Sequence, residues 1–337
     1  MTLAHADGTY PVAELAADAW TLGVVQSRVH PAADRAELRA NLDHMLHLID
    51  NAHHYGMGPE LLFFHEFPIS GWDVWTKREA LTRAIEIPGE ETDAIAKKAR
   101  EYSCYVAFGA YVTDPDWPGH LLSITTLIGP DGSVAAKHWK ARNAKGVFPG
   151  FELYTTTTYD VLEEYTERYG ADAVLPVART PLGNIALSSC QLEPEYFRAL
   201  AIKGAEVILR TATGSFNEVD VRSTSLHNQV YTAIVNNALG QQSGPFFEDT
   251  GAGRSAVYGP DGAAMAGPAD KFETLLTARI PIAAFRERHR QPNLHWDLVR
   301  PVFAAYVSRY RPGLFSDYQP ADLGDAARYL ADKSRWK

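Results

Sequence analysis

The sequence predicts a single α/β domain in which short apolar strands alternate with amphipathic helices. Three observations lead to this fold class. The alternation continues from about residue 20 to 290, and no linker rich in Pro, Gly and Ser interrupts it. The 46% hydrophobic and 22% charged residues are ordinary values for a folded globular protein. We therefore expect residues 20–290 to form one domain, preceded by a polar leader at 1–19 and followed by an aromatic, Arg-rich tail at 291–337.

Strands and helices alternate in the first half of the chain. Apolar residues spaced three and four apart over 34–55 indicate an amphipathic helix. A continuous apolar run at 59–66, followed by Pro68 and Gly71, indicates a buried strand that opens into a loop. A Gly-Pro-Asp-Gly turn at 129–132 joins two later strands. The expected strands are 20–26, 59–66, 104–112, 121–128 and 133–140, and the expected helices are 34–55 and 90–102.

The second half resumes the alternation after a loop at 143–158, which contains Gly and Pro but no periodic pattern. A second Gly-Pro-Asp-Gly turn at 259–262 suggests that the chain contains two similar halves, although two copies of a common turn explain it equally well. The expected strands are 174–178, 184–189, 206–210, 231–237, 272–280 and a hairpin within 255–265, and the expected helices are 159–169, 194–203, the start of 220–239, and 281–290.

The composition limits the partners and cofactors that the chain can have. A net charge of -9 gives no basic surface for nucleic acid, and no lysine-rich amphipathic segment suggests a membrane, so we expect a small-molecule substrate. The only two cysteines are Cys104, expected in the core, and Cys190, and no secretory signal pattern precedes the first strand, so we expect a cytoplasmic protein without disulfides. The twelve histidines lack metal-site spacings and no Gly-rich phosphate loop occurs, so we expect no metal and no other cofactor.

Glu66, Lys140 and Cys190 each lie at the C-terminal end of an expected strand, where α/β sheets present their functional groups. A cysteine between a strand and a helix has its thiolate near helix amides, which lowers its pKa. A carboxylate can take the thiol proton, and a lysine together with the backbone amide of Gln191 can stabilise an oxyanion. The alternatives are a buried structural cysteine, a capping or surface carboxylate, and a solvated lysine.

Several segments resemble the carbon–nitrogen hydrolase, or nitrilase, superfamily, and the resemblance spans most of residues 20–315. It implies a four-layer α-β-β-α sandwich, a Glu-Lys-Cys triad at Glu66, Lys140 and Cys190, no cofactor, and a homodimer or larger homo-oligomer whose C-terminal tails cross between subunits. The segments that carry it are Leu62-Phe-Phe-His-Glu66, Lys137-His-Trp-Lys140, Phe148-Pro-Gly150, Ile185-Ala-Leu-Ser-Ser-Cys190, Lys203-Gly-Ala-Glu-Val-Ile, Asn236-Asn237, Gly253-Arg-Ser255 and Gly259-Pro-Asp-Gly262.

The chain departs from the family pattern around the substrate. Gln191-Leu192 follows the cysteine, where family amidases and nitrilases have other residues. The second glutamate that orients substrate in many members is missing from 141–150, so Asn143 or Glu152 is expected to replace it, and Gln191 is expected to bind substrate. Loops 113–120, 143–158 and 212–218 are expected to line the pocket, and the insertion at 154–170 to form a pocket wall or an oligomer contact.

These observations predict an amidase-type enzyme. It is expected to hydrolyse the C–N bond of a small amide or carbamoyl compound through a thioester on Cys190, releasing ammonia or an amine. Hydrolysis of a nitrile is the alternative within the family. A catalytically idle binding subunit with the same fold is the alternative of another class, because the residues after Cys190 and the second glutamate differ from the family pattern.

Overall fold

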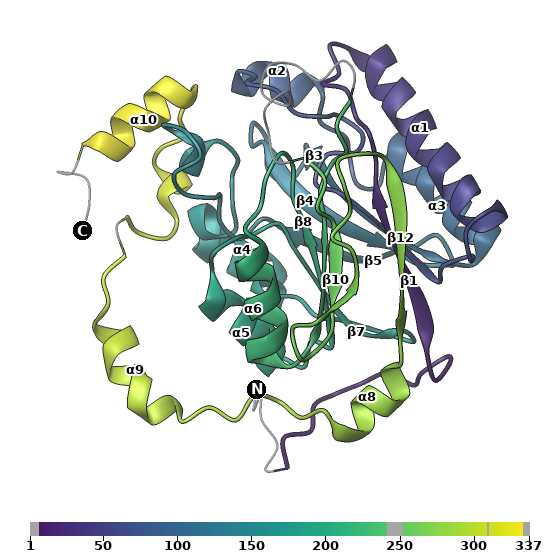
Figure 1. The fold of residues 1–337 in the computed structure, drawn as a ribbon. Coiled ribbons are helices and arrows are strands. Elements are labelled where there is room, and N and C mark those ends of the chain that lie inside the picture. Colours follow the sequence, from purple (N-terminus) through teal and green to yellow (C-terminus); the bar gives the residue numbers. More distant parts are fainter. Residues whose placement is uncertain (1–6, 241–251, 309, 333–337) are drawn as a thin grey trace.

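Two six-stranded β-sheets lie at the centre of the protein (Figure 1). The structure is a computed structural model and describes residues 7–240, 252–308 and 310–332. The first sheet has the order β12-β1-β2-β3-β4-β5 and the second the order β11-β10-β9-β8-β7-β6. The strands are β1 (Trp20–Gln26), β2 (Leu61–Phe64), β3 (Tyr105–Val112), β4 (Leu122–Ile128), β5 (Val134–Trp139), β6 (Ala178–Thr180), β7 (Gly183–Ser188), β8 (Val207–Thr211), β9 (Tyr231–Val235), β10 (Ala256–Tyr258), β11 (Ala264–Ala266) and β12 (Thr274–Ile280).

The two sheets pack face to face, and helices cover both outer faces. Successive strand residues point to opposite faces, so Phe63 joins the core between the sheets, whereas Phe64 joins the core beneath α1 (Arg35–His54) and α3 (Glu90–Tyr102). On the other side, α5 (Pro194–Ile202) packs on the second sheet beside α6 (Glu218–Asn228). Figure 1 shows the two helix pairs on opposite sides of the strands. The predicted four-layer α-β-β-α sandwich is confirmed.

The two halves of the chain repeat one topology. In β1 to β5 and again in β7 to β11, three parallel strands are followed by two antiparallel ones. The Gly-Pro-Asp-Gly turn connects the last two strands of each set. Its backbone bonds match, because Gly129 N–H donates to Ser133 O and Gly259 N–H donates to Ala263 O, both at 2.8 Å. The repeated turn therefore belongs to a repeated half.

Helix boundaries follow local capping signals. α1 begins after Asp34, whose carboxylate accepts from the amides of Ala36 and Glu37. The helix expected at 159–169 is present as a 3₁₀ turn (Tyr159–Val161) and α4 (Leu162–Tyr169). The one expected at 281–290 is α8 (Ile282–Arg288). Among the described residues, no helix is long and apolar enough to cross a membrane.

The structure corrects three expectations. The strand expected at 174–178 is β6, which begins only at Ala178, because Pro176 lacks an N–H for the sheet and residues 171–174 form a 3₁₀ turn. Three helices were not expected from the sequence: α2 (Lys77–Thr82), α9 (Trp296–Ala305) and α10 (Leu323–Ala331). Of these, α2 carries a recognisable capping box formed by Thr76 and Glu79.

The leader is not wholly a surface segment, because the Tyr10 side chain is buried and its hydroxyl donates to Glu206 Oε1 at 3.0 Å. Residues 1–6 of the expected leader, and 309 and 333–337 of the expected tail, lie outside the described residues.

Candidate active site

Glu66 and Lys140 form a buried ion pair at the ends of two strands. Glu66 follows β2, and its backbone N–H donates to Ala212 O of the second sheet at 3.4 Å. Lys140 directly follows β5, and its N–H donates to Ser123 O at 2.8 Å. The Lys140 Nζ donates to Glu66 Oε1 at 2.8 Å, and both residues are more than nine-tenths buried. The first sheet thus brings together two residues that are far apart in the chain.

Stability alone does not account for this ion pair. Removing two charges from water costs about as much as their mutual attraction returns, so a buried salt bridge contributes little to folding on average. The Lys140 Nζ lies 5.9 Å from the centre of the Phe151 ring. Charged groups buried in a cavity are typical of catalytic sites.

Cys190 lies just after the end of β7, and the charge of Lys140 acts on its thiol. Its side chain is 1% exposed, and the thiol donates to Arg142 O at 3.6 Å. Its neighbours Ser189 and Gln191 line the same cavity as Glu66 and Lys140. Within the described residues, no hydrogen bond joins the thiol to Glu66. Catalytic hydrogen bonds are often formed only when substrate is bound, so this apo geometry does not disqualify the thiol.

Burial raises the pKa of the Cys190 thiol above its ordinary value, although backbone hydrogen bonding at Arg142 and the positive charge of Lys140 act in the opposite direction. The expectation that a helix N-terminus would lower this pKa is therefore wrong. The reason is geometric, because α5 begins only at Pro194, whose nitrogen carries no hydrogen. The resting group at neutral pH is a thiol, so it needs a base in order to react.

A second buried ion pair holds the turn after Cys190. The guanidinium of Arg210, at the end of β8, donates to Cys190 O at 3.1 Å and forms an ion pair with Asp220 of α6. Asp220 Oδ2 in turn accepts from Leu192 N–H at 2.9 Å. Leu192 has a left-handed backbone, φ 57°, which a residue with a Cβ rarely adopts. We call Arg210 and Asp220 the turn clamp.

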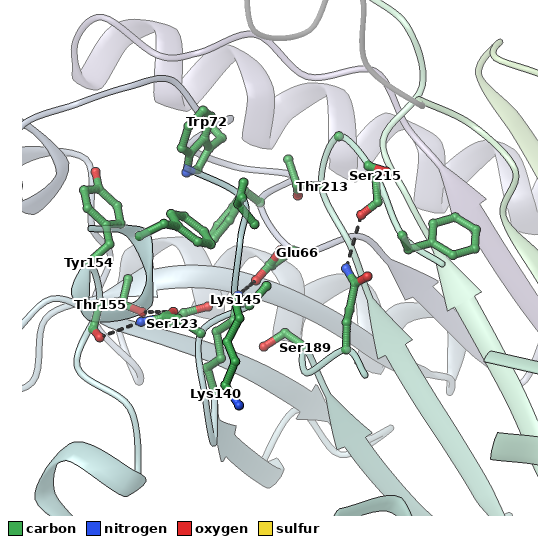
Figure 2. A pocket seen from close by; sticks show the side chains of 18 of the residues that line it. Glu66, Trp72, Ser123, Lys140, Lys145, Tyr154, Thr155, Ser189, Thr213 and Ser215 are labelled. Carbon is green, nitrogen blue, oxygen red and sulfur yellow. Dashed lines mark hydrogen bonds and ion pairs between the residues drawn. The ribbon is translucent and has the colours of Figure 1, made fainter. Parts of the chain in front are cut away.

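A cavity of about 500 Å³ opens over Glu66 and Lys140 (Figure 2). One wall is aromatic and the other consists of polar side chains and loop backbone. In Figure 2, Trp72 and Tyr154 lie on one side of the Glu66–Lys140 pair, and Thr213 and Ser215 lie on the other. The lining residues are Glu66, Phe67, Trp72, Tyr111, Ser123, Lys140, Asn143, Ala144, Lys145, Val147, Phe148, Phe151, Tyr154, Thr155, Ser189, Gln191, Leu192, Glu193 and 213–217.

The three expected substrate-binding residues are placed differently from one another. Gln191 lines the cavity, and its side-chain amide donates to Ser215 O at 3.1 Å. Asn143 also lines it, but its amide nitrogen donates to the carbonyls of Glu152 and Thr155, so it holds the loop together. Glu152 does not line this cavity and instead faces a smaller one of about 120 Å³ together with Arg142 and Tyr310.

The sequence reading found part of the cavity wall. The expected loops 143–158 and 212–218 line it, whereas 113–120 does not. Within the 154–170 insertion, Tyr154 and Thr155 line the cavity, while Tyr165 packs 5.0 Å from the ring of Trp139. Glu193, the second carboxylate of the wall, was not among the expected site residues. Its position three residues after Cys190 was a usable signal.

The described residues contain no group of three or more His, Cys, Asp or Glu side chains that could hold a metal ion. Cys104 packs in the core beneath α1 and α3, as expected, and burial raises its pKa to about 12.

Comparisons with known proteins agree with this architecture. The chain is similar to a formamidase from Bacillus cereus, with 26% identity over 291 residues that cover 83% of this chain and 78% of the relative. It is also similar to a bifunctional nitrilase/nitrile hydratase from Lupinus angustifolius, with 24% identity over 278 residues that cover 77% of this chain and 72% of the relative.

Two solved structures share the fold. A double mutant of the amidase from Nesterenkonia sp. AN1 in complex with acrylamide has a TM-score of 0.63 and 16% identity, covering 88% of this chain and 100% of that chain. A Saccharomyces cerevisiae member of branch 10 of the nitrilase superfamily has a TM-score of 0.65 and 18% identity, covering 82% and 95%. A family model described as carbon–nitrogen hydrolase matches residues 21–290. This chain therefore belongs to the carbon–nitrogen hydrolase family.

Proposed function

We propose that the protein hydrolyses the C–N bond of an amide through a thioester on Cys190. The observation that carries the proposal is the buried Lys140–Glu66 ion pair, with Nζ and Oε1 2.8 Å apart, at the base of a cavity whose wall contains both neighbours of Cys190. Ser189 and Gln191, the two neighbours of Cys190, line the same cavity as this carboxylate and this ammonium, which supports a role for Cys190 beside them.

In the first half of the reaction, Glu66 takes the thiol proton as the sulfur attacks the carbonyl carbon. The negative charge that forms on the oxygen is stabilised by the Lys140 ammonium and by the backbone N–H of Gln191, and a single donor of this kind contributes about 3 kcal/mol. The C–N bond then breaks, and protonated Glu66 returns the proton to the leaving ammonia or amine. The thioester remains on Cys190.

In the second half, Glu66 takes a proton from a water molecule that attacks the thioester carbon. The C–S bond breaks, the sulfur regains its proton from Glu66, and a carboxylic acid leaves. The sum is one amide and one water converted into one acid and one amine. Because burial raises the pKa of Cys190, the reaction depends on a base near the thiol.

The relatives support this reaction class. The Bacillus cereus relative is a formamidase, and the Nesterenkonia amidase has been solved with the acetamide moiety of fluoroacetamide added covalently at its active-site cysteine. The Lupinus relative is a bifunctional nitrilase/nitrile hydratase, so hydrolysis of a nitrile is the second candidate. In that reaction the thiol adds to the nitrile carbon to give a thioimidate, which water then hydrolyses.

Replacing the two cysteines separately tests the proposal. Cys190→Ala should lose all detectable release of ammonia or amine, and Glu66→Gln should lose about 10²- to 10⁴-fold in kcat. Cys104→Ala is the matched control, because Cys104 is buried in a different core. A Cys190→Ala protein that keeps its activity would contradict the proposal. Wild-type protein that hydrolyses neither amides nor nitriles would favour the idle binding subunit.

A further inference from the structure

Trp72, Phe148, Phe151 and Tyr154 form an aromatic wall of the cavity that contains Glu66 and Lys140. Phe148 and Phe151 are half-buried, with ring centres 4.9 Å apart. Trp72 lies behind them, 5.9 Å from the ring centre of Phe148 and 6.5 Å from that of Phe151. Tyr154 continues the wall, with its ring nearly parallel to Phe151 at 6.1 Å. Such surfaces gain most by stacking on another flat apolar group.

The cavity is large for a minimal amide. Its volume is about 500 Å³, whereas an apolar cavity of roughly 150 Å³ already holds a benzene molecule. Formamide would leave most of the aromatic wall in contact with water, so its binding would gain little from that wall. The volume falls in the range of sites that enclose ligands of drug size, about 300–1,000 Å³.

Polar side chains also line the base of the cavity and the wall opposite these rings. Ser189, Gln191 and Thr213 lie there, close to the Lys140–Glu66 pair. The hydroxyl oxygen of Thr213 is buried and has no hydrogen-bond partner among the described residues. A substrate amide can supply such a partner. The cavity is therefore divided into a polar end that fits an amide and an apolar wall that fits a ring.

We propose that the substrate is an amide carrying a flat apolar group of about the size of one aromatic ring. This group packs against Phe148 and Phe151, whose rings are tilted 57° to each other, while the amide reaches the Lys140–Glu66 pair. This substrate class rests on the proposed hydrolysis at Cys190 and goes beyond it. The roles proposed for Glu66, Lys140 and Cys190 do not by themselves select the size of the group attached to the amide.

A matched set of amides tests the inference. Formamide and acetamide are compared with phenylacetamide, which carries the ring on the acyl side, and N-benzylacetamide, which carries it on the amine side. At least one aryl amide should have a kcat/KM about 10-fold or more above that of acetamide. An equal or higher kcat/KM for acetamide than for both aryl amides would overturn the substrate class and leave the hydrolysis intact.

Variants then locate the preference. Phe148→Ala should lower the ratio of aryl amide to acetamide kcat/KM about 10-fold or more, and Phe148→Leu, which keeps the wall apolar, should lower it less. Phe272→Ala is the control, because Phe272 is 68% exposed and lies outside the cavity lining. A ratio unchanged in both Phe148 variants would contradict stacking on this wall. Turnover of none of the amides would count against the proposed function itself.

Discussion

At the residue scale, the position of Cys190 depends on the turn clamp. Arg210 is 1% exposed, and its guanidinium lies 4.1 Å from the Phe197 ring centre while it contacts Cys190 O, Asp220 and Thr224. Burial lowers the pKa of Arg210, which Asp220 counteracts. Because a buried ion pair contributes little to stability on average, we interpret the clamp as a pair that fixes the backbone around Cys190.

Asp220→Asn should therefore impair both activity and folding. The change leaves the Arg210 charge buried without its partner, which costs about 3–5 kcal/mol in the free energy of unfolding. It also weakens the contact to Leu192 N–H, so kcat should fall about 10- to 100-fold, measured on the fraction that remains folded. Glu218→Gln is the matched control, because Glu218 lies on the same helix as Asp220 and its ion pair with Arg254 is partly exposed. Loss of that ion pair should lower the free energy of unfolding by less than about 1 kcal/mol. Equal effects of the two changes would argue against the clamp.

At the element scale, the contact between β2 and β3 positions Glu66. Gly109 of β3 donates its N–H to His65 O at 3.0 Å, and a Cβ at position 109 would come within 2.3 Å of Glu66 O. The backbone that precedes the ion pair thus packs directly against a residue without a side chain. This contact explains the glycine at a position where a strand would otherwise favour a larger residue.

Gly109→Ala should displace Glu66 without altering any residue of the cavity lining. A shift of about 1 Å in a catalytic group typically lowers the rate about 100-fold, so kcat/KM should fall by that order. Gly324→Ala serves as the control, because the nearest atom to its added Cβ is the Asp322 carboxylate at 3.2 Å. Steady-state kinetics with thermal unfolding of both variants separates displacement from general destabilisation. Unchanged kcat/KM in Gly109→Ala would contradict this role.

Elements with local sequence signals were predictable, whereas contacts between distant segments were not. The buried strands and the long helices were predictable, because their period and their caps are local signals, as at Asp34. Glu66, Lys140 and Cys190 could be selected because each follows a readable strand. The turn clamp could not be predicted, because it depends on how closely β8 and α6 approach each other in the folded protein. The aromatic wall was likewise hidden, because its residues come from loops whose conformation follows no period.

At the scale of the whole molecule, buried histidines make folding sensitive to acid. Burial lowers the pKa of His65 to about 3 and those of His138 and His289 to about 4. An unfolded chain takes up these protons near pH 6.5, whereas the native protein does not, so stability is lost as the pH falls below about 6.5. Asp160 has the opposite effect on stability. Burial raises its pKa to about 6, so its contribution to the free energy of unfolding is lost as the pH rises through that value.

The free energy of unfolding should therefore fall between about pH 6.5 and pH 4.5, by about 2–3 kcal/mol for each of His138 and His289. Urea unfolding at several pH values measures it. His138→Gln, which cannot take up a proton, should flatten the dependence, while a change at the exposed His47 to Gln should not. A flat dependence in the unmodified protein would show that these histidines do not resist protonation.

The tail helix α9 should mediate self-association. It stands away from the sheets in Figure 1, and its residues Leu298 and Val302 are 79% and 71% exposed. Apolar surface of this kind is normally covered by a partner, and we expect a second copy of the chain. Light scattering should find a dimer or larger oligomer for the natural sequence and a smaller species for Leu298→Glu combined with Val302→Glu. Tyr55→Glu, an exposed position on another face, is the control. A monomeric natural protein would contradict this expectation.

The most direct test of the central claim is the mass of the protein during turnover. Intact-protein mass spectrometry of samples acid-quenched in the presence of an aryl amide should reveal a species heavier by the acyl group, and peptide mapping should locate it on Cys190. The same species should form in Cys104→Ala and be absent from Cys190→Ala. Hydrolysis that proceeds with no adduct on Cys190, or with an adduct on Cys104, would contradict the account.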